Sequence, residues 1–171
     1  MDNDIVDIEP YNVLFISTGN SARCVMAQAI LNHVGKGRFK AHAAGTFPKG
    51  EAHPMAVAEL RSMQVPVETT PGKSWNDFAK ADAEAMDFIF TVCDEAAGET
   101  CPVWPGQPLT AHWGIPDPVA VQGDESQKQH AFRDAALALK RRIDLMLALP
   151  LEKLDRMAIH QHLTDIGAAR H

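Results

Sequence analysis

The stretch NVLFISTGNSARC, residues 12–24, decides how this chain begins to fold. Residues 12–16 form a short apolar run with β-branched and aromatic members, which predicts a buried strand. Small residues follow, and apolar residues at positions 26, 30 and 31 then indicate a helix. A strand that enters a helix through a tight loop directs backbone N–H groups and the helix N-terminus at one point. This junction therefore predicts an anion-binding loop.

Arg23 supplies the side-chain charge of this loop, because its guanidinium can bind a tetrahedral oxyanion with two parallel hydrogen bonds. The loop lacks the Gly-Lys pair of a nucleotide-binding P-loop and the Gly-x-Gly-x-x-Gly of a dinucleotide site. Taken alone, these residues favour a simple helix cap, and the anion site depends on the later motifs. The predicted oxyanion-binding residues are Ser17, Thr18, Gly19, Asn20, Ser21, Ala22 and Arg23.

The loop resembles the pattern Cys-x5-Arg-Ser/Thr of the low-molecular-weight tyrosine phosphatases and the thioredoxin-coupled arsenate reductases. The similarity continues in the expected order to about residue 150. The other matching segments are Ala44-Gly45, His53-Pro54, Lys73-Ser74-Trp75, Thr91-Val92-Cys93-Asp94, Cys101-Pro102 and Pro116-Asp117-Pro118. The resemblance implies a three-layer α/β fold whose four-stranded parallel sheet has a flavodoxin-like strand order. It also implies an anion site at the carboxyl end of the first strand.

Two chemical positions depart from that pattern. Ser17 stands where the family has its nucleophilic cysteine, and Cys24 stands where the family has a hydroxyl. A serine oxygen cannot end in a disulfide, so Ser17 alone does not support a thiol-based reduction. The resemblance implies that the two side chains meet, and the helix dipole and Arg23 both favour a thiolate at Cys24. The alternatives are a natural loss of activity with retained oxyanion binding, or a deliberate change of nucleophile, which explains Ser17 but not Cys24.

Asp117 is the second chemical candidate. It lies between Pro116 and Pro118, although a Pro-Asp-Pro triplet on its own is more often a surface turn. The resemblance implies that Asp117 overhangs the anion loop and protonates the leaving oxygen as a general acid. Phosphatases of the family usually carry a tyrosine after their Asp-Pro, whereas here Val119 follows and Tyr11 is the only tyrosine. This difference disfavours a phosphotyrosine substrate.

Cys93 and Cys101 are the third candidate. Free cysteines usually pack as small hydrophobic residues, and the seven residues between these two are more than common zinc sites have. We therefore predict no metal. In the arsenate reductases two resolving cysteines lie at the end of the third strand and in the loop that follows. The resemblance implies that Cys93 and Cys101 hold these positions, so that Cys24, Cys93 and Cys101 form a thiol relay.

Alternating strand and helix patterns predict an α/β fold with a parallel sheet. Strands are expected at residues 12–16, 39–45, 87–93 and 109–113, and a long amphipathic helix at 124–149. Helices are also expected to start at His53-Pro54 and after Ser74, with Ser74 as the N-cap. We expect His53 to be a capping or surface residue. We expect a phosphatase-like or arsenate reductase domain over residues 1–150, and a helical tail over 151–171 packed on it.

The composition of the chain limits the classes of binding partner that we expect. The chain has 171 residues, enough for one domain with a substantial core. Its formal net charge of -6, without a basic run, disfavours nucleic acids and anionic membranes. No apolar stretch approaches membrane-spanning length, and the acidic first residues do not resemble a secretory signal. An odd number of cysteines, three, then predicts reduced thiols and a cytoplasmic location.

Three functions remain open. The first is an arsenate reductase of the thioredoxin-coupled type, acting in arsenic resistance and altered or impaired at Ser17. It would bind no cofactor, and it would depend on an external thiol reductant, the thioredoxin or glutathione system. The second is a low-molecular-weight protein tyrosine phosphatase. The third is a non-catalytic protein that binds arsenate, phosphate or sulfate.

Overall fold

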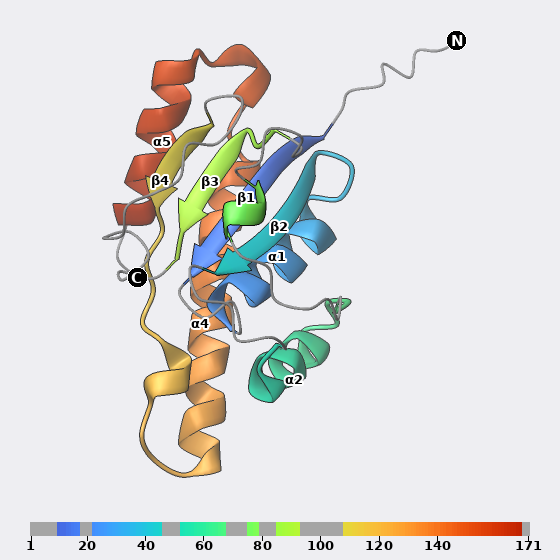
Figure 1. Ribbon diagram of the computed structural model, residues 1–171, viewed down its shortest axis with the longest axis vertical. Helices are drawn as coiled ribbons and strands as arrows, with labels where there is room; N and C mark the ends of the chain where they lie inside the picture. Colours follow the sequence, from blue (N-terminus) through green and yellow to red (C-terminus); the bar gives the residue numbers. More distant parts are fainter. Residues whose placement is uncertain are drawn as a thin grey trace.

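The computed structural model describes residues 10–17, 22–45, 52–67, 75–78, 85–92 and 108–168. Within these residues four parallel strands form one sheet in the order β2-β1-β3-β4 (Figure 1). The strands are β1 (Tyr11–Ser17), β2 (Phe39–Gly45), β3 (Phe88–Thr91) and β4 (Leu109–His112). This order confirms the flavodoxin-like arrangement that the resemblance implied. β3 ends before Cys93, which lies outside the described residues.

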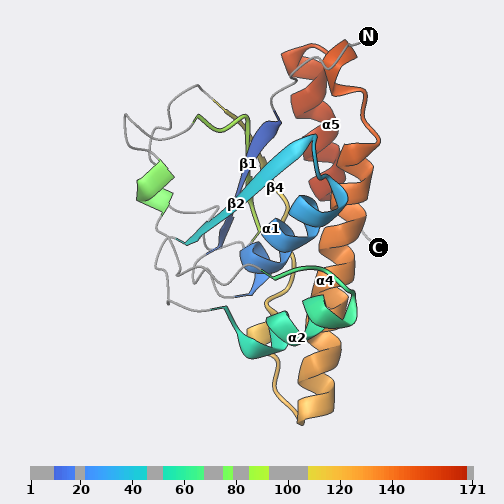
Figure 2. The same ribbon diagram turned by 90° about the vertical axis from the view of Figure 1, so that its right-hand side faces the viewer.

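Helices lie on the faces and at one edge of this sheet. They are α1 (Arg23–Val34), α2 (Pro54–Ser62), α4 (Glu125–Leu147) and α5 (Arg156–Ala168), with 3-10 turns η1 (Trp75–Phe78), η2 (Pro118–Ala120) and η3 (Leu151–Lys153). The side view places α1 and α4 on one face of the sheet and η1 on the other (Figure 2). Of the helix expected after Ser74, the described residues contain the single turn η1, and Ser74 itself lies outside them.

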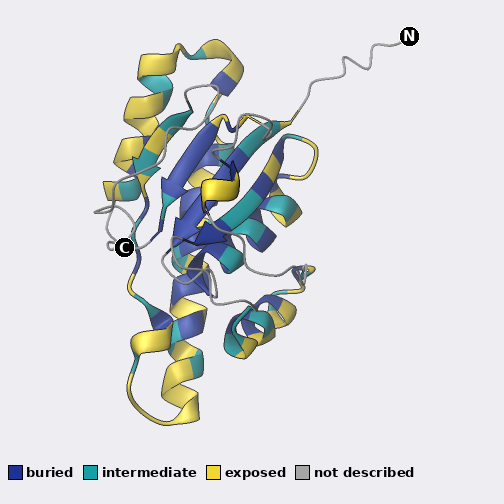
Figure 3. Cartoon of the chain, viewed as in Figure 1, coloured by how far each residue is buried: buried dark blue, intermediate teal, exposed yellow. Residues whose placement is uncertain are grey.

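The central strand β1 is buried on both faces, because residues 13–16 have no exposed surface. Val13 and Phe15 belong to the large core cluster that includes the buried apolar residues of α1 and α4. Leu14 and Ile16 point the other way, into a smaller cluster with Phe78 of η1. Figure 3 shows this buried centre in dark blue. Burial on two faces explains why the sequence of β1 reads as a continuous apolar run without alternation.

Two helices begin where local capping chemistry directs. The Asp124 carboxylate accepts a hydrogen bond from the Gln127 backbone N–H at 2.8 Å, and the Gln127 side chain accepts one from the Asp124 N–H at 2.9 Å. This reciprocal capping box fixes the start of α4 at the predicted position. At α2, His53 Nδ1 accepts from the Met55 N–H at 3.1 Å, so His53 has the predicted capping role.

Helix α5 lies against β4, one of the two edge strands of the described sheet (Figure 1). Trp113 Nε1 donates a hydrogen bond to the Leu163 carbonyl at 2.9 Å, and His160 Nε2 lies 3.1 Å from the Thr110 carbonyl oxygen. The first contact ties α5 to the residue that follows β4, and the second occupies a β4 backbone carbonyl that an uncovered edge would present to other chains. In the part of the chain that the structure describes, no helix has the length and apolar character needed to cross a membrane.

Candidate active site

The candidate site lies between the carboxyl end of β1 and the N-terminus of α1. Ser17 is the last residue of β1 and pairs with Gly45 of β2. Ala22 precedes α1, and Arg23 and Cys24 are its first two residues. The predicted oxyanion-binding residues 18–21 lie outside the described residues. The described residues on either side have the predicted order, with β1 ending at Ser17 and α1 beginning at Arg23.

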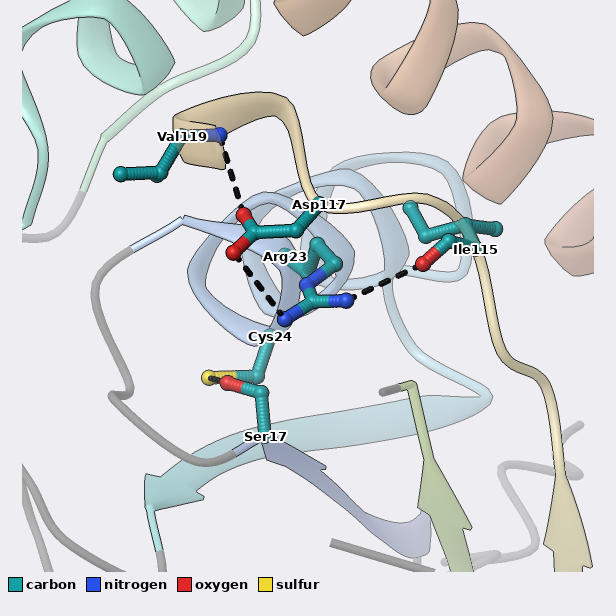
Figure 4. A network of polar contacts seen from close by, with 6 residues as sticks. All are labelled: Ser17, Arg23, Cys24, Ile115, Asp117 and Val119. Carbon is teal, nitrogen blue, oxygen red and sulfur yellow. Dashed lines mark hydrogen bonds and ion pairs between the residues drawn. The ribbon is translucent and has the colours of Figure 1, made fainter. Parts of the chain in front are cut away.

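Ser17 and Cys24 meet at the base of this junction (Figure 4). The Ser17 hydroxyl donates a hydrogen bond to Cys24 Sγ at 2.9 Å. Cys24 has no exposed surface and Ser17 is 3% exposed. The contact that we expected between these two residues is therefore present. A hydroxyl that donates to sulfur stabilises negative charge on that sulfur, while the burial of both residues restricts access from solvent.

Arg23 contacts a second, distant segment of the chain. Its Nη1 donates to the Ile115 carbonyl at 3.1 Å, and its Nη2 lies 3.7 Å from Asp117 Oδ2. The Arg23 side chain is 10% exposed, whereas that of Asp117 is 38% exposed. Figure 4 shows the guanidinium between the two acceptors, above the Ser17–Cys24 pair. The predicted cation and the predicted general acid therefore lie at the same site, although about a hundred residues separate them in sequence.

Local hydrogen bonding fixes the position of Asp117. Its Oδ1 accepts from the Val119 backbone N–H at 3.0 Å, and this bond caps the short turn η2. Pro116 and Pro118 restrict the backbone on either side. The remaining oxygen, Oδ2, faces Arg23. Asp117 is thus held by its own turn and is partly open to solvent, which suits a group that exchanges protons.

One buried residue near the site was not among the sequence predictions. Arg142 of α4 is 6% exposed, and its Nη1 donates to the carbonyls of Trp113 at 2.8 Å and Gly114 at 2.9 Å. Leu139, Arg142 and Ile143 are positions i, i+3 and i+4 of α4, so Arg142 lies on the same buried helical face as the other two. That position in the helical period was the available signal, because a charged residue on an apolar face needs a specific partner.

Six of the predicted site residues lie outside the part of the chain that the structure describes. Cys93 and Cys101 lie outside the described residues, as do Thr18 to Ser21. Among the residues that the structure describes, no group of three histidine, cysteine or acidic side chains is placed to hold a metal ion. The described site therefore consists of Ser17, Arg23, Cys24 and Asp117, with backbone contributed by Ile115.

Comparison with known proteins gives consistent matches. The family model described as "Low molecular weight phosphotyrosine protein phosphatase" matches residues 12–158. The arsenate reductase of Bacillus subtilis is 29% identical over 122 residues, which cover 71% of this chain and 84% of that protein.

Solved structures match the fold. A structure described as an arsenate reductase in the reduced state aligns with a TM-score of 0.64 at 21% identity, covering 81% of this chain and 97% of that one. A thioredoxin-dependent arsenate reductase of Corynebacterium glutamicum aligns with a TM-score of 0.54 at 23% identity. That alignment covers 81% of this chain and 64% of the Corynebacterium chain.

Proposed function

Because this chain belongs to the low-molecular-weight phosphotyrosine protein phosphatase family, we propose that it binds a tetrahedral oxyanion and slowly reduces arsenate to arsenite. The proposed anion-binding residues are Ser17 to Arg23, with the oxyanion held by the loop N–H groups and by the Arg23 guanidinium. The proposed reductant is an external dithiol of the thioredoxin or glutathione type. A thiol relay needs reduced cysteines, so we place this chemistry in the cytoplasm.

The observation that carries the proposal is the hydrogen bond from Ser17 to Cys24. It places a thiol at the base of the junction, in the first turn of α1, although β1 ends in a hydroxyl. The helix N-terminus and the neighbouring Arg23 both favour a thiolate there. The reducing atom that Ser17 cannot supply is thus available from a residue in contact with it.

The proposed reaction uses three thiols. The Cys24 thiolate attacks arsenic(V), and one arsenate hydroxyl group takes a proton from Asp117 and leaves as water. A second thiolate, from Cys93, then attacks the Cys24 sulfur; the sulfur–arsenic electron pair stays on arsenic, which leaves as arsenite. The Cys24–Cys93 disulfide passes to Cys93–Cys101 by exchange. The external dithiol finally reduces that disulfide and is itself oxidised.

The same geometry makes the reaction slow. A sulfur on α1 approaches the anion from a different direction than a sulfur on β1, so in-line transfer of a phosphoryl group should be largely lost. Arsenic exchanges oxygen ligands for thiolates more readily, so arsenate reduction should be less affected. Cys24 is also fully buried, which limits contact with the bound anion. We therefore propose weak arsenate reduction that depends on Cys24, with negligible hydrolysis of aryl phosphates.

Two measurements test this function. In a thioredoxin-coupled arsenate reduction assay, the chain should turn over slowly, and Cys24→Ala should abolish turnover. In calorimetry with phosphate or arsenate, Arg23→Ala should weaken binding by about 10- to 150-fold, which corresponds to about 1.5–3 kcal/mol for charged hydrogen bonds. Unchanged affinity in Arg23→Ala would show that Arg23 does not contact the anion.

A second candidate is a non-catalytic oxyanion-binding protein, which Ser17 and the buried Cys24 sulfur favour. Thermal stabilisation by phosphate or arsenate without any thioredoxin-coupled turnover would select it. A third candidate, phosphatase activity, is disfavoured by Val119 in place of the tyrosine typical of the family's phosphatases. Substantial turnover of an aryl phosphate by the unmodified chain would nevertheless select the phosphatase.

A further inference from the structure

Arg142 is a buried cation whose hydrogen-bond partners in the described structure are neutral. It is 6% exposed, and its two hydrogen bonds go to the backbone carbonyls of Trp113 and Gly114. Burial lowers the pKa of Arg142 from its ordinary value, although an arginine stays protonated in proteins. Burying a charge without a countercharge is costly, and an apolar residue of similar volume often packs as well or better. Packing alone is therefore a poor reason for an arginine at this position.

The two carbonyls that Arg142 binds begin the segment 113–117, which leads from β4 to the candidate site. The next residue, Ile115, gives its carbonyl to Arg23 Nη1 at 3.1 Å, and its N–H donates to the Val92 carbonyl at 3.2 Å. The segment ends at Asp117, which lies 3.7 Å from Arg23 Nη2. Arg142 thus holds the start of the segment in which the Ile115 carbonyl binds Arg23.

We propose that Arg142 is a positioning residue of the oxyanion site. It fixes segment 113–117 from the α4 side, so that the Ile115 carbonyl orients the Arg23 guanidinium before an anion arrives. This inference rests on the proposed function, because it concerns the affinity of the same anion site. Without Arg142, Arg23 must be ordered when the anion binds, and ordering one long side chain weakens affinity by about 2- to 12-fold.

The test is calorimetry of the full chain with inorganic phosphate. Arg142→Met keeps much of the volume and removes both hydrogen bonds, so it should weaken phosphate binding by about 2- to 12-fold. Arg142→Lys keeps one charged donor and should bind with an affinity between those of Arg142→Met and the unmodified chain. The matched control is Ile143→Val, which removes one buried methylene from the residue that follows Arg142 in α4 and leaves both hydrogen bonds of Arg142 in place. It should lower Tm while phosphate affinity stays unchanged.

A double-mutant cycle separates positioning from general destabilisation. If Arg142 acts through Arg23, then adding Arg142→Met to Arg23→Ala should cause no further loss of phosphate affinity. Equal losses in both backgrounds, or a folded Arg142→Met variant that binds like the unmodified chain, would overturn the inference. If Arg142→Met does not fold, Arg142→Lys in the same cycle decides. If instead the unmodified chain binds no phosphate, or Arg23→Ala binds equally well, the proposed function itself fails.

Discussion

Exchanging the two side chains at the base of the site should restore the family's chemistry. The double variant Ser17→Cys with Cys24→Ser puts a sulfur at the end of β1 and a hydroxyl in the first turn of α1. In the structure the two side-chain atoms are 2.9 Å apart, and both residues are at most 3% exposed. The exchange keeps one oxygen, one sulfur and their contact, so the buried volume is conserved. Volume-conserving core changes usually cost less than about 1.5 kcal/mol of unfolding free energy.

The expected change in activity is much larger than this change in stability. Restoring an absent nucleophile typically raises the rate by about 10⁴-fold or more, which corresponds to about 5 kcal/mol of transition-state stabilisation. We therefore expect aryl phosphate hydrolysis and thioredoxin-coupled arsenate reduction to rise by orders of magnitude, with a Tm close to that of the unmodified chain. Both activities should be measured on the same preparation, together with a thermal unfolding curve.

The single variants are the controls. Ser17→Cys alone adds the sulfur but removes the hydroxyl that donates to Cys24, so its gain should be smaller than that of the double variant. Cys24→Ser alone leaves two hydroxyls and should have no arsenate reduction. The reasoning is refuted if the double variant folds, binds phosphate with unchanged affinity and gains neither activity. It is also refuted if the unmodified chain already hydrolyses aryl phosphates efficiently.

Three further predictions concern Asp117, Cys93 and Asp124. Asp117→Asn removes the carboxylate that competes with phosphate for Arg23. Because a partly exposed ion pair is worth up to about 1 kcal/mol, phosphate binding in calorimetry should tighten by up to about 5-fold. Weaker phosphate binding in this variant would contradict the competition. Mild peroxide should produce an intramolecular disulfide that includes Cys93 and that thioredoxin reduces. If mass spectrometry finds only unmodified thiols, Cys93 serves in packing and not in a thiol relay. Asp124→Ala removes the capping box of α4 and should cost about 0.5–2 kcal/mol of stability in denaturant unfolding, while phosphate affinity stays the same.

The sequence predicted the elements of the fold because their signals are local. The apolar run at residues 12–16 and the capping residue Asp124 each act within a few neighbours, and both mark elements at the expected places. The strand order is a different kind of information. It depends on how each crossover connection packs, which periodicity does not encode, and here it came from the family resemblance.

The candidate site was predictable only in part, because half of its contacts join distant segments. The loop sequence identified Arg23, the resemblance gave Asp117 its role, and the structure places the two side chains 3.7 Å apart. The Ile115 carbonyl was not predictable, since every residue has a carbonyl and only the path of the backbone selects this one. Arg142 was visible as a charge on an inward helical face, but its acceptors are also backbone atoms of a distant loop.

The Ser17–Cys24 pair illustrates why folding and catalysis respond differently to the same substitution. Packing depends on volume and on satisfied hydrogen bonds, and exchanging a hydroxyl with a thiol across a 2.9 Å contact conserves both. Catalysis depends on the direction from which the nucleophile approaches, because the attacking and leaving atoms must be aligned. Ser17 ends a strand and Cys24 begins a helix, so the exchange redirects the sulfur without disturbing the core. A chain with this exchange can therefore keep its fold and its anion site while it loses the phosphoryl-transfer reaction.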